Sequence, residues 1–192
     1  MPVVFPTFTK AKGRRSLVAA IDAPVTGATA VADGTFTGGT LSLAALTAPG
    51  NSVNVSCYTF GNTSGALTAE PQRGEAPARA CDIVGREEFG RTNFTVANLN
   101  YGYDPQGGPQ VEANAAKEFL PPLSDRALVE RLGKPAKVED LAIDDIVSVY
   151  EVTVSSQNRQ PTGDDDQAEN AIDQAAVLAS GGNVYHDVKI VA

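Results

Sequence analysis

Alternating apolar and polar positions indicate several β-strands along the chain. Residues 51–60 place small apolar residues, the last of them Cys57, on one side and polar residues on the other. This two-residue alternation is typical of a strand with one buried face, so Cys57 is interpreted as a small core residue. Residues 146–155 are rich in valine and apolar on both sides, which predicts a central strand. A shorter alternation predicts a strand at residues 16–23.

Further strand patterns are short or interrupted. Residues 92–103 alternate, but their apolar phase shifts near residues 97–98, and such a shift predicts a β-bulge. Residues 184–191 follow a Gly-Gly pair and alternate again, which predicts a last strand inside a sheet. Residues 41–46 are a candidate for a short strand, and the Thr-, Gly- and Ala-rich residues 24–40 are interpreted as a linker.

Helical patterns are fewer. Residues 110–120 have apolar positions four residues apart and end before a Pro-Pro pair, which predicts a helix. Residues 124–133 fit a helix and a strand equally well, because a serine and a glycine frame a segment that also alternates. The alanines of residues 171–180 favour a helix.

Two segments show no periodic pattern. Residues 1–15 contain two prolines near their start together with Phe5 and Phe8, and we expect an extended arm that orders on a partner surface through these phenylalanines. Residues 61–86 are rich in Gly, Ala, Pro and Arg, and a connection of this length is either functional or disordered. The predicted organisation is therefore an arm at 1–15 and a single β-rich domain at 16–192 with a long loop.

Composition agrees with a β-rich domain. The chain has 192 residues, of which 42% are hydrophobic and 20% charged, enough to bury a core. Val and Ile together outnumber Leu about two to one, as in sheet-rich proteins. No apolar stretch approaches the roughly 20 residues of a membrane span, and the N-terminus lacks a signal-peptide pattern, so we expect an unprocessed cytosolic chain without a membrane partner.

Charge is distributed unevenly along a chain of net charge −8. Residues 139–192 contain eleven acids against two bases, whereas residues 1–15 contain no acid. The basic residues of the arm are Lys10, Lys12, Arg14 and Arg15. Two solvated termini explain this split, and so does a head-to-tail polymer in which the basic end of one copy meets the acidic end of the next. The acidic balance argues against sequence-specific DNA binding.

Most familiar catalytic sites are excluded. Cys57 and Cys81 are too few for a disulfide framework or a zinc site, and the single histidine excludes any site that needs two. The glycine pairs fit turns rather than phosphate-binding loops, and the aspartates at 144–145 and 164–166 lack calcium-ligand spacing. Without tryptophan, a sugar-cleaving cleft is also disfavoured. We therefore expect no enzyme activity, no metal and no cofactor.

His186 is interpreted structurally. It falls on the predicted inward face of residues 184–191, where a hydrogen-bonded imidazole in a core or interface is far commoner than a catalytic base, and no motif pairs it with a nucleophile. The features that remain are an unpatterned arm, a long loop and opposed terminal charges on a β scaffold. Together they indicate a self-assembling subunit.

The order of these landmarks resembles a known family. They are a Gly-Gly-Thr turn at 38–40, the strand SVNVSCY at 52–58, Ala-Cys-Asp at 80–82, Tyr-Gly-Tyr-Asp-Pro at 101–105, LVER at 128–131, Gly-Lys-Pro at 133–135 and IVSVYEVTV at 146–154. From about residue 16 onward this order resembles the major tail proteins of long-tailed bacteriophages, particularly those that infect Actinobacteria.

The resemblance implies a fold and an assembly. It implies a mainly β chain, an antiparallel β-sandwich or barrel with a flanking short α-helix. It favours a strand at 127–132, and an extended conformation where the alanines of 171–180 favour a helix. It also implies six copies per ring and rings stacked into a tail tube, through which the genome passes at ejection without specific binding.

The resemblance also implies partners and contact residues. The partners are other copies of the chain and the tail terminator, tape measure and distal tail proteins, in the virion tail after assembly in the host cytoplasm. Arms and long loops join successive rings in such tubes, so the expected ring-to-ring contacts are Phe5, Phe8, Lys10, Lys12, Arg14, Arg15, Arg73 and Arg79.

Charge provides a hypothesis for the bore of such a tube. Six copies at −8 carry −48 per ring, and acids that line the bore, with Asp164, Asp165 and Asp166 as candidates, repel DNA so that it slides. The alternative function is that of a capsid decoration or head–tail connector protein. A hydrolytic or carbohydrate-binding β domain is a further alternative.

Overall fold

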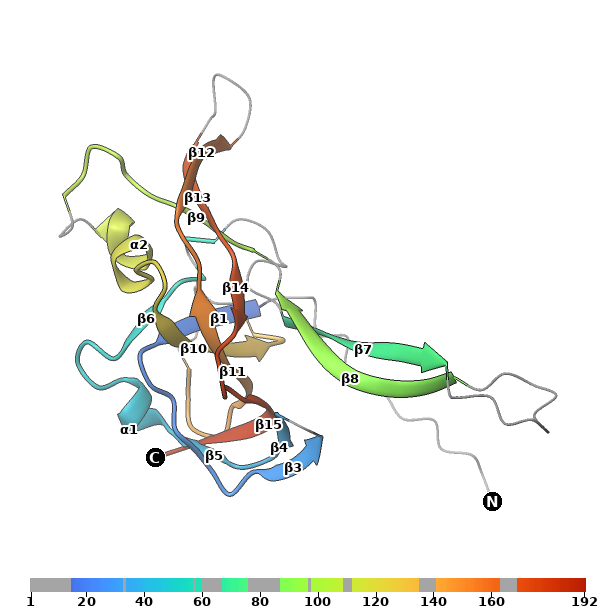
Figure 1. Ribbon diagram of the computed structural model, residues 1–192. Coiled ribbons are helices and arrows are strands. Elements are labelled where there is room, and N and C mark those ends of the chain that lie inside the picture. The colour runs from blue at the N-terminus through green and yellow to red at the C-terminus, as the bar shows by residue number, and fades with distance from the viewer. Residues whose placement is uncertain are drawn as a thin grey trace, which may run out of the picture.

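The chain is built around a curved, mixed β-sheet (Figure 1). The computed structural model describes residues 15–32, 34–56, 58–59, 67–75, 87–96, 98–108, 112–134, 141–162 and 169–192. Among these residues, ten strands form one sheet whose main path runs β2-β5-β15-β11-β10-β1-β6. The strands are β1 (Arg15–Ala20), β2 (Val25–Thr26), β3 (Thr29–Ala32), β4 (Thr35–Thr37), β5 (Thr40–Ser42), β6 (Ser52–Asn54), β10 (Asp125–Leu132), β11 (Ile146–Val154), β14 (Ala176–Leu178) and β15 (Val184–Val191).

Smaller elements lie against or extend from this sheet. A three-stranded sheet contains β9 (Leu99–Gly102), β12 (Asn158–Thr162) and β13 (Glu169–Gln174), and a two-stranded hairpin contains β7 (Leu67–Glu75) and β8 (Glu87–Val96). The helices are α1 (Leu43–Leu46), the 3-10 turn η1 (Glu112–Asn114) and α2 (Ala115–Phe119). Figure 1 shows the hairpin β7–β8 projecting away from the rest of the described chain.

Two cores lie on opposite faces of the central strands, because successive side chains of a strand point to opposite faces. One core joins the sheet to β9, β13 and α2. Its buried residues are Leu17, Ala19, Val55, Leu99, Tyr101, Ala116, Leu120, Leu128, Tyr150, Val152, Val154, Ile172, Ala176 and Val184. The other lies on the opposite face of the sheet and includes Leu46 of α1. Its buried residues are Val18, Ala20, Ala23, Leu41, Leu46, Ala127, Val129, Val147, Val149, Val188 and Ile190.

Several predicted elements are confirmed. Strand β11 covers residues 146–154 and lies centrally, paired with β10 on one side and with β15 and β14 on the other. Strands β1 and β15 match the predictions for residues 16–23 and 184–191, and the open question at residues 124–133 is answered by strand β10. The helix predicted at 110–120 is shorter, comprising η1 and α2.

Two predictions for the middle of the chain were wrong. The bulged strand expected at 92–103 is instead two strands, because β8 pairs with β7 whereas β9 pairs with β13 in another sheet. The phase shift near 97–98 therefore indicated a change of sheet. The long loop expected at 61–86 contains β7, which pairs with β8 at eight of its nine residues. Polar and charged residues within β7 hid its strand character from a pattern based on burial.

Predictions in the N-terminal third also need correction. Residues 41–46 are the end of β5 followed by α1, which begins where the Ser42 hydroxyl accepts a hydrogen bond from the Ala45 N–H. The linker expected at 24–40 contains β2, β3 and β4. The strand expected at 51–60 shortens to β6, because the Asn54 side chain accepts from the Ser56 N–H and turns the chain. Cys57 lies outside the described residues.

The helix expected at residues 171–180 was wrong as well. This segment contributes to the strands β13 and β14. The hydrogen bonds of the buried Gln174 side chain explain why it is a strand and not a helix. Its side-chain amide donates to the carbonyls of Leu120 and Ser155 at 3.1 and 2.8 Å, and its carbonyl accepts from the Tyr101 hydroxyl at 2.9 Å. These long-range contacts outweigh the helical preference of alanine.

The overall class is confirmed with two refinements. The described chain is mainly β with a short flanking helix, as in a β-sandwich, but its large sheet does not close into a barrel. The sheet is also not purely antiparallel, because β15 pairs in parallel with β4 and β5. No helix within the described residues is long and apolar enough to cross a membrane.

Candidate assembly surfaces

The described part of the chain shows no cluster of three or more metal-ligating side chains. The pair Asp144 and Asp145, considered above as calcium ligands, instead binds cationic side chains. Asp144 accepts from Lys189 at 2.7 Å, and Asp145 accepts from both Arg131 and Lys134 at 2.7 Å. Both carboxylates therefore form ion pairs within the chain.

The Asp145 cluster connects the end of β10 to the start of β11. Burial of the Asp145 carboxylate raises its pKa, but hydrogen bonds from Lys134, Arg131 and the Ala142 N–H outweigh that effect and lower the pKa to about 2. Arg131 is 1% exposed although it is charged. The cluster thus links the end of β10 to the start of β11.

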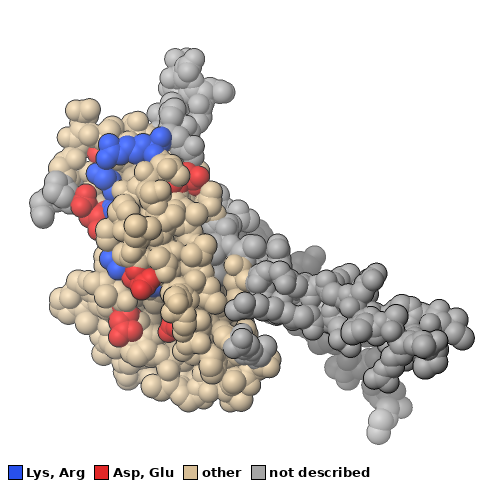
Figure 2. Space-filling model, viewed as in Figure 1, with Lys and Arg blue, Asp and Glu red and all other residues tan. Residues whose placement is uncertain are grey.

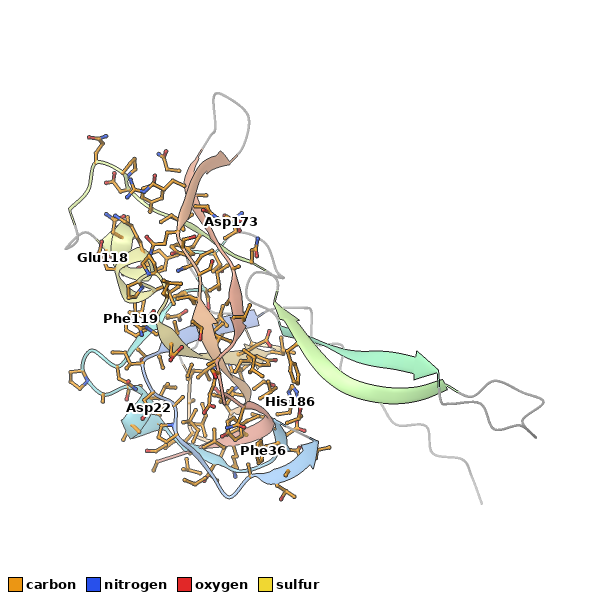
Figure 3. The ribbon with its side chains drawn as sticks, viewed as in Figure 1. Asp22, Phe36, Glu118, Phe119, Asp173 and His186 are labelled. Carbon is orange, nitrogen blue, oxygen red and sulfur yellow. The ribbon has the colours of Figure 1, made fainter. Side chains whose placement is uncertain are left out.

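His186 occupies the position of a structural histidine. Its ring Nδ1 lies 3.3 Å from the Ser148 hydroxyl, and its ring meets Tyr150 edge-on with 6.1 Å between ring centroids. The Tyr150 hydroxyl in turn donates to the Glu130 carboxylate at 2.9 Å. The side chains of these residues lie on one face of β10, β11 and β15 and are buried or half-buried. Figure 3 marks the position of His186.

Open strand edges are one type of surface suited to association. Among the strands that the structure describes, β6 at one end of the main sheet path pairs with β1 alone, and β2 at the other end pairs with β5 alone. In the described part of the small sheet, β12 is paired only with β13. Within the described residues these edges leave backbone N–H and C=O groups on which another chain can add a strand. The projecting β7–β8 hairpin has two further edges of this kind.

Basic side chains stack on aromatic rings near α2. Lys117 and Arg159 lie over the Tyr103 ring, at 5.7 and 5.8 Å from its centroid, and Arg126 lies over Phe119 at 5.4 Å. Figure 2 shows Lys and Arg side chains gathered at the upper part of the body, with separate Asp and Glu side chains beside and below them. The sequence analysis did not identify this group, because its members are distant in sequence and only the aromatic residues stood out.

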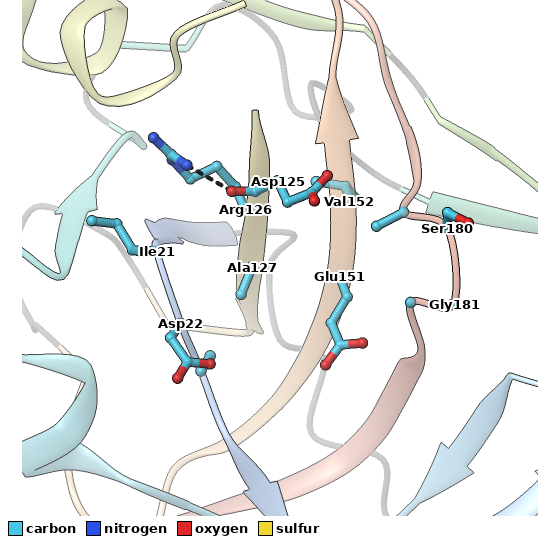
Figure 4. Close-up of a pocket in the computed structure, with 12 residues that line it drawn as sticks. Ile21, Asp22, Asp125, Arg126, Ala127, Glu151, Val152, Ser180 and Gly181 are labelled. Carbon is cyan, nitrogen blue, oxygen red and sulfur yellow. Dashed lines mark hydrogen bonds between the residues drawn. The ribbon is translucent and has the colours of Figure 1, made fainter. Parts of the chain in front are cut away.

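An acidic hollow of about 240 Å³ opens beside β1, β10 and β11. Asp22 follows β1, Asp125 begins β10 and Glu151 lies on β11, and Figure 4 shows their carboxylates around the hollow. Glu151 accepts from the Asn183 N–H at 2.8 Å, which ties the hollow to the turn before β15. The sequence analysis missed these acids because nothing in their spacing brings them together.

Few of the residues selected from the sequence fall in the described chain. Arg15 begins β1, where its backbone pairs with Leu132, and Arg73 lies in β7, where its backbone pairs with Phe89. The other expected contacts lie outside the described residues, namely Phe5, Phe8, Lys10, Lys12, Arg14, Arg79, Asp164, Asp165 and Asp166. In the sequence, the three aspartates fall between β12 and β13.

Comparison with known protein families identifies one family that matches this chain. A family model described as phage tail tube protein matches residues 25–178, a span that runs from β2 to β14 and includes the hairpin, the three-stranded sheet and all strands of the large sheet except β1 and β15. A comparison with curated proteins gives no match.

Proposed function

The chain belongs to the phage tail tube protein family, and from this premise we propose that its copies close into hexameric rings that stack into the tube of a phage tail. The observation that carries the proposal is the family match over residues 25–178. The open edges of β2, β6 and β12 support it, because a ring of copies provides each edge with a neighbour.

We assign the contacts between copies to the N-terminal arm, to the β7–β8 hairpin and to the oppositely charged ends of the chain. Residues 16–192 act as one unit, and residues 1–15 act as an arm whose Phe5 and Phe8 bind a neighbouring ring. The hairpin carrying Arg73 projects from the body and is well placed to reach another copy. The basic residues of the arm bind the acidic C-terminal third of a neighbouring copy, as the uneven charge of the sequence suggests.

The proposed partners and location follow from the same role. The tube binds the tail terminator, tape measure and distal tail proteins, is assembled in the host cytoplasm and resides in the virion tail. DNA passes through the bore at ejection without specific binding. Asp164, Asp165 and Asp166 are proposed to line the bore, where a ring of six copies at −8 carries −48 in total and repels the phosphate backbone.

Electron microscopy of the purified protein over a range of concentrations tests the proposal. We expect hollow tubes built of stacked rings, with six-fold symmetry in end views. Discrete rings that never stack would favour the alternative of a head–tail connector or decoration protein. A monomer at high concentration would contradict both.

A further inference from the structure

The strands β3 and β4 form a hairpin whose two ends meet at a closed base. At this base β2 pairs with β5 through Thr26 and Thr40, whose hydroxyl oxygens lie 3.1 Å apart. Between these two paired residues, β3 pairs with β4, and β4 lies beside β15 at the lower edge of the body in Figure 1. We call the hairpin β3–β4 the flap, because it is attached to the sheet through this base.

Glycines lie at both ends of the flap. Gly27 follows β2 with a φ of 72°, and Gly38 and Gly39 precede β5 with φ angles of 70° and 93°. Glycine adopts such angles at little cost, whereas other residues are rarely found there. A Cβ added at Gly39 would lie 2.9 Å from the Thr26 carbonyl oxygen, but one added at Gly27 or Gly38 would meet no described atom within 4 Å. Gly39 therefore belongs to a tight base, and Gly27 and Gly38 are free hinge points beside it.

Burial changes at these glycines. Ala23 lies before the first hinge and Leu41 after the second, and they are 4% and 0% exposed. Of the flap side chains whose burial the structure describes, none is buried, and Val31 is 66% exposed. Because apolar burial supplies most of the stability of a fold, the flap is held less strongly than the strands on either side of it.

A short backbone ladder holds the flap on β15. Strand β4 pairs in parallel with three residues of β15, Val184 to His186. The Val184 N–H donates to the Gly34 carbonyl at 2.8 Å, and the Gly38 N–H donates to the His186 carbonyl at 2.9 Å. The opposite edge of β15 pairs with β11, and its last residues pair with β5. Opening of the flap therefore removes one short ladder and leaves the rest of the sheet paired.

The side-chain contacts between the flap and β15 lie at the surface. The Phe36 ring stacks on the Tyr185 ring with 5.3 Å between centroids. The Thr37 hydroxyl donates to the Asp187 carboxylate at 3.4 Å in an exposed hydrogen bond. Water replaces an exposed hydrogen bond at a small net cost, so the ring stack is the main side-chain contact that resists opening.

We propose that the flap opens from β15 as a unit about Gly27 and Gly38, and that the closed flap keeps the β15 edge from adding a strand of another copy. Opening leaves the Val184 N–H and the His186 carbonyl without their flap partners. A strand edge with unpaired groups of this kind binds further strands, and proteins commonly cover such edges with a loop or helix. The flap acts in the single chain, so it is independent of the proposed tube.

Hydrogen exchange of the wild-type protein, followed by NMR below the concentration for assembly, tests the opening. The Lys189 N–H lies on the same edge of β15 as the Val184 N–H, but it donates to the Gly39 carbonyl of the base at 3.0 Å. After correction for intrinsic rates, Val184 and Gly38 should show the same protection within about threefold, and should exchange at least about tenfold faster than Lys189. Equal protection at Val184 and Lys189 would overturn the inference.

Phe36→Ala and Val31→Ala form a matched pair within the flap. Loss of the Phe36 ring removes the stack on Tyr185, so exchange at Val184 should rise about threefold or more while Lys189 is unchanged. Val31 is exposed, and its truncation should change neither rate by more than about 1.5-fold. Equal effects of the two substitutions, or an equal rise at Lys189, would contradict opening about the two hinges.

Excision of residues 28–38 tests the protective role. It joins Gly27 to Gly39 and leaves a Gly-Gly loop between the paired residues Thr26 and Thr40, a length and composition typical of β-hairpins. Because no described flap side chain is buried, the variant should keep the circular dichroism and the urea unfolding midpoint of the wild type. In analytical ultracentrifugation it should associate at a concentration at least about tenfold below that of the wild type. The Val184 N–H should exchange freely in the dilute variant and become protected on association.

The outcomes separate the flap from the tube. An excised variant that unfolds, or that associates at the same concentration as the wild type, would overturn the flap as a removable cover. Association in which the Val184 N–H still exchanges freely would show that another surface binds, and would overturn it as well. Absence of tubes from the wild-type protein would contradict the proposed function but would leave the exchange results, and with them the flap, unaffected.

Discussion

Replacing Asp145 by asparagine should destabilise the fold far more than the same change at Asp144. Asp145 is 5% exposed and binds Arg131, Lys134 and the Ala142 N–H. Removing its charge breaks the ion pair between Asp145 and the buried Arg131 guanidinium. The two neighbouring aspartates thus form a matched pair in which only burial and partners differ.

The size of the effect follows from two estimates. The pKa of Asp145 falls from 3.8 to about 2, and a pKa unit corresponds to about 1.4 kcal/mol, so the ionised form contributes about 2 kcal/mol to folding. Breaking a buried ion pair by removing one partner costs about 3–5 kcal/mol in other proteins. We therefore expect Asp145→Asn to lower the free energy of unfolding by about 2–4 kcal/mol.

The pH dependence has a definite sign. Because the pKa of Asp145 is lower in the folded than in the unfolded chain, its contribution is fully present above about pH 4 and is lost as the pH falls towards 2. The difference in unfolding free energy between wild type and Asp145→Asn should therefore shrink as the pH is lowered through this range. Urea unfolding followed by circular dichroism, below the concentration for assembly, measures it.

Asp144→Asn is the control. The Asp144 side chain is 73% exposed and its partner Lys189 is 52% exposed, so the loss should stay below about 1 kcal/mol. Equal losses for the two variants at neutral pH would refute the reasoning. So would a difference between wild type and Asp145→Asn that does not change between pH 5 and pH 2.

Three further predictions concern the core, a close backbone approach and the bore. Leu128→Ala, at a fully buried position, should cost about 2–5 kcal/mol in urea unfolding, whereas Leu132→Ala on the exposed end of the same strand should cost less than about 1 kcal/mol. Gly182→Ala should lower the melting temperature by several degrees, because the added Cβ would lie 2.8 Å from a strand carbonyl oxygen, while Gly108→Ala, with nothing within 4 Å, should leave it unchanged. Replacing the three aspartates at 164–166 by lysine should leave rings forming but slow genome delivery, and unchanged infectivity would count against an acidic bore at these positions.

Strands with a strong local pattern could be predicted from the sequence. Residues 146–154 are apolar on both faces, and the structure places most of them between two cores. Residues 184–191 could be predicted from their alternation of apolar and polar positions. The bulge inside β15, where Asp187 adopts a φ of 55°, leaves only a weak trace in the sequence because it depends on pairing with β11.

Elements that depend on distant partners could not be predicted. The alanines near residue 171 favour a helix locally, but Ile172 pairs with Tyr101, and the side-chain hydrogen bonds of Gln174 reach across the fold. The strand β7 contains polar and charged residues without a clear alternation, and its backbone pairs with β8. In both cases pairing over long sequence distances overrides local preference.

The assembly surfaces were least accessible to sequence analysis. Leu132 and Ile146 have the same residue types as core positions, and their exposure results from which elements cover each end of the sheet. Asp22 and Asp125 are about a hundred positions apart in sequence and meet at one hollow only in the folded chain. Charge asymmetry could be read from the sequence, but its spatial arrangement could not.

A cryo-EM reconstruction of the phage tail tests the central claim most directly. The account predicts that this chain fits the density of every tube ring, with the open edges of the described strands paired to neighbouring copies. Density for the chain confined to the capsid or the head–tail junction, with a different protein in the tube, would contradict the account.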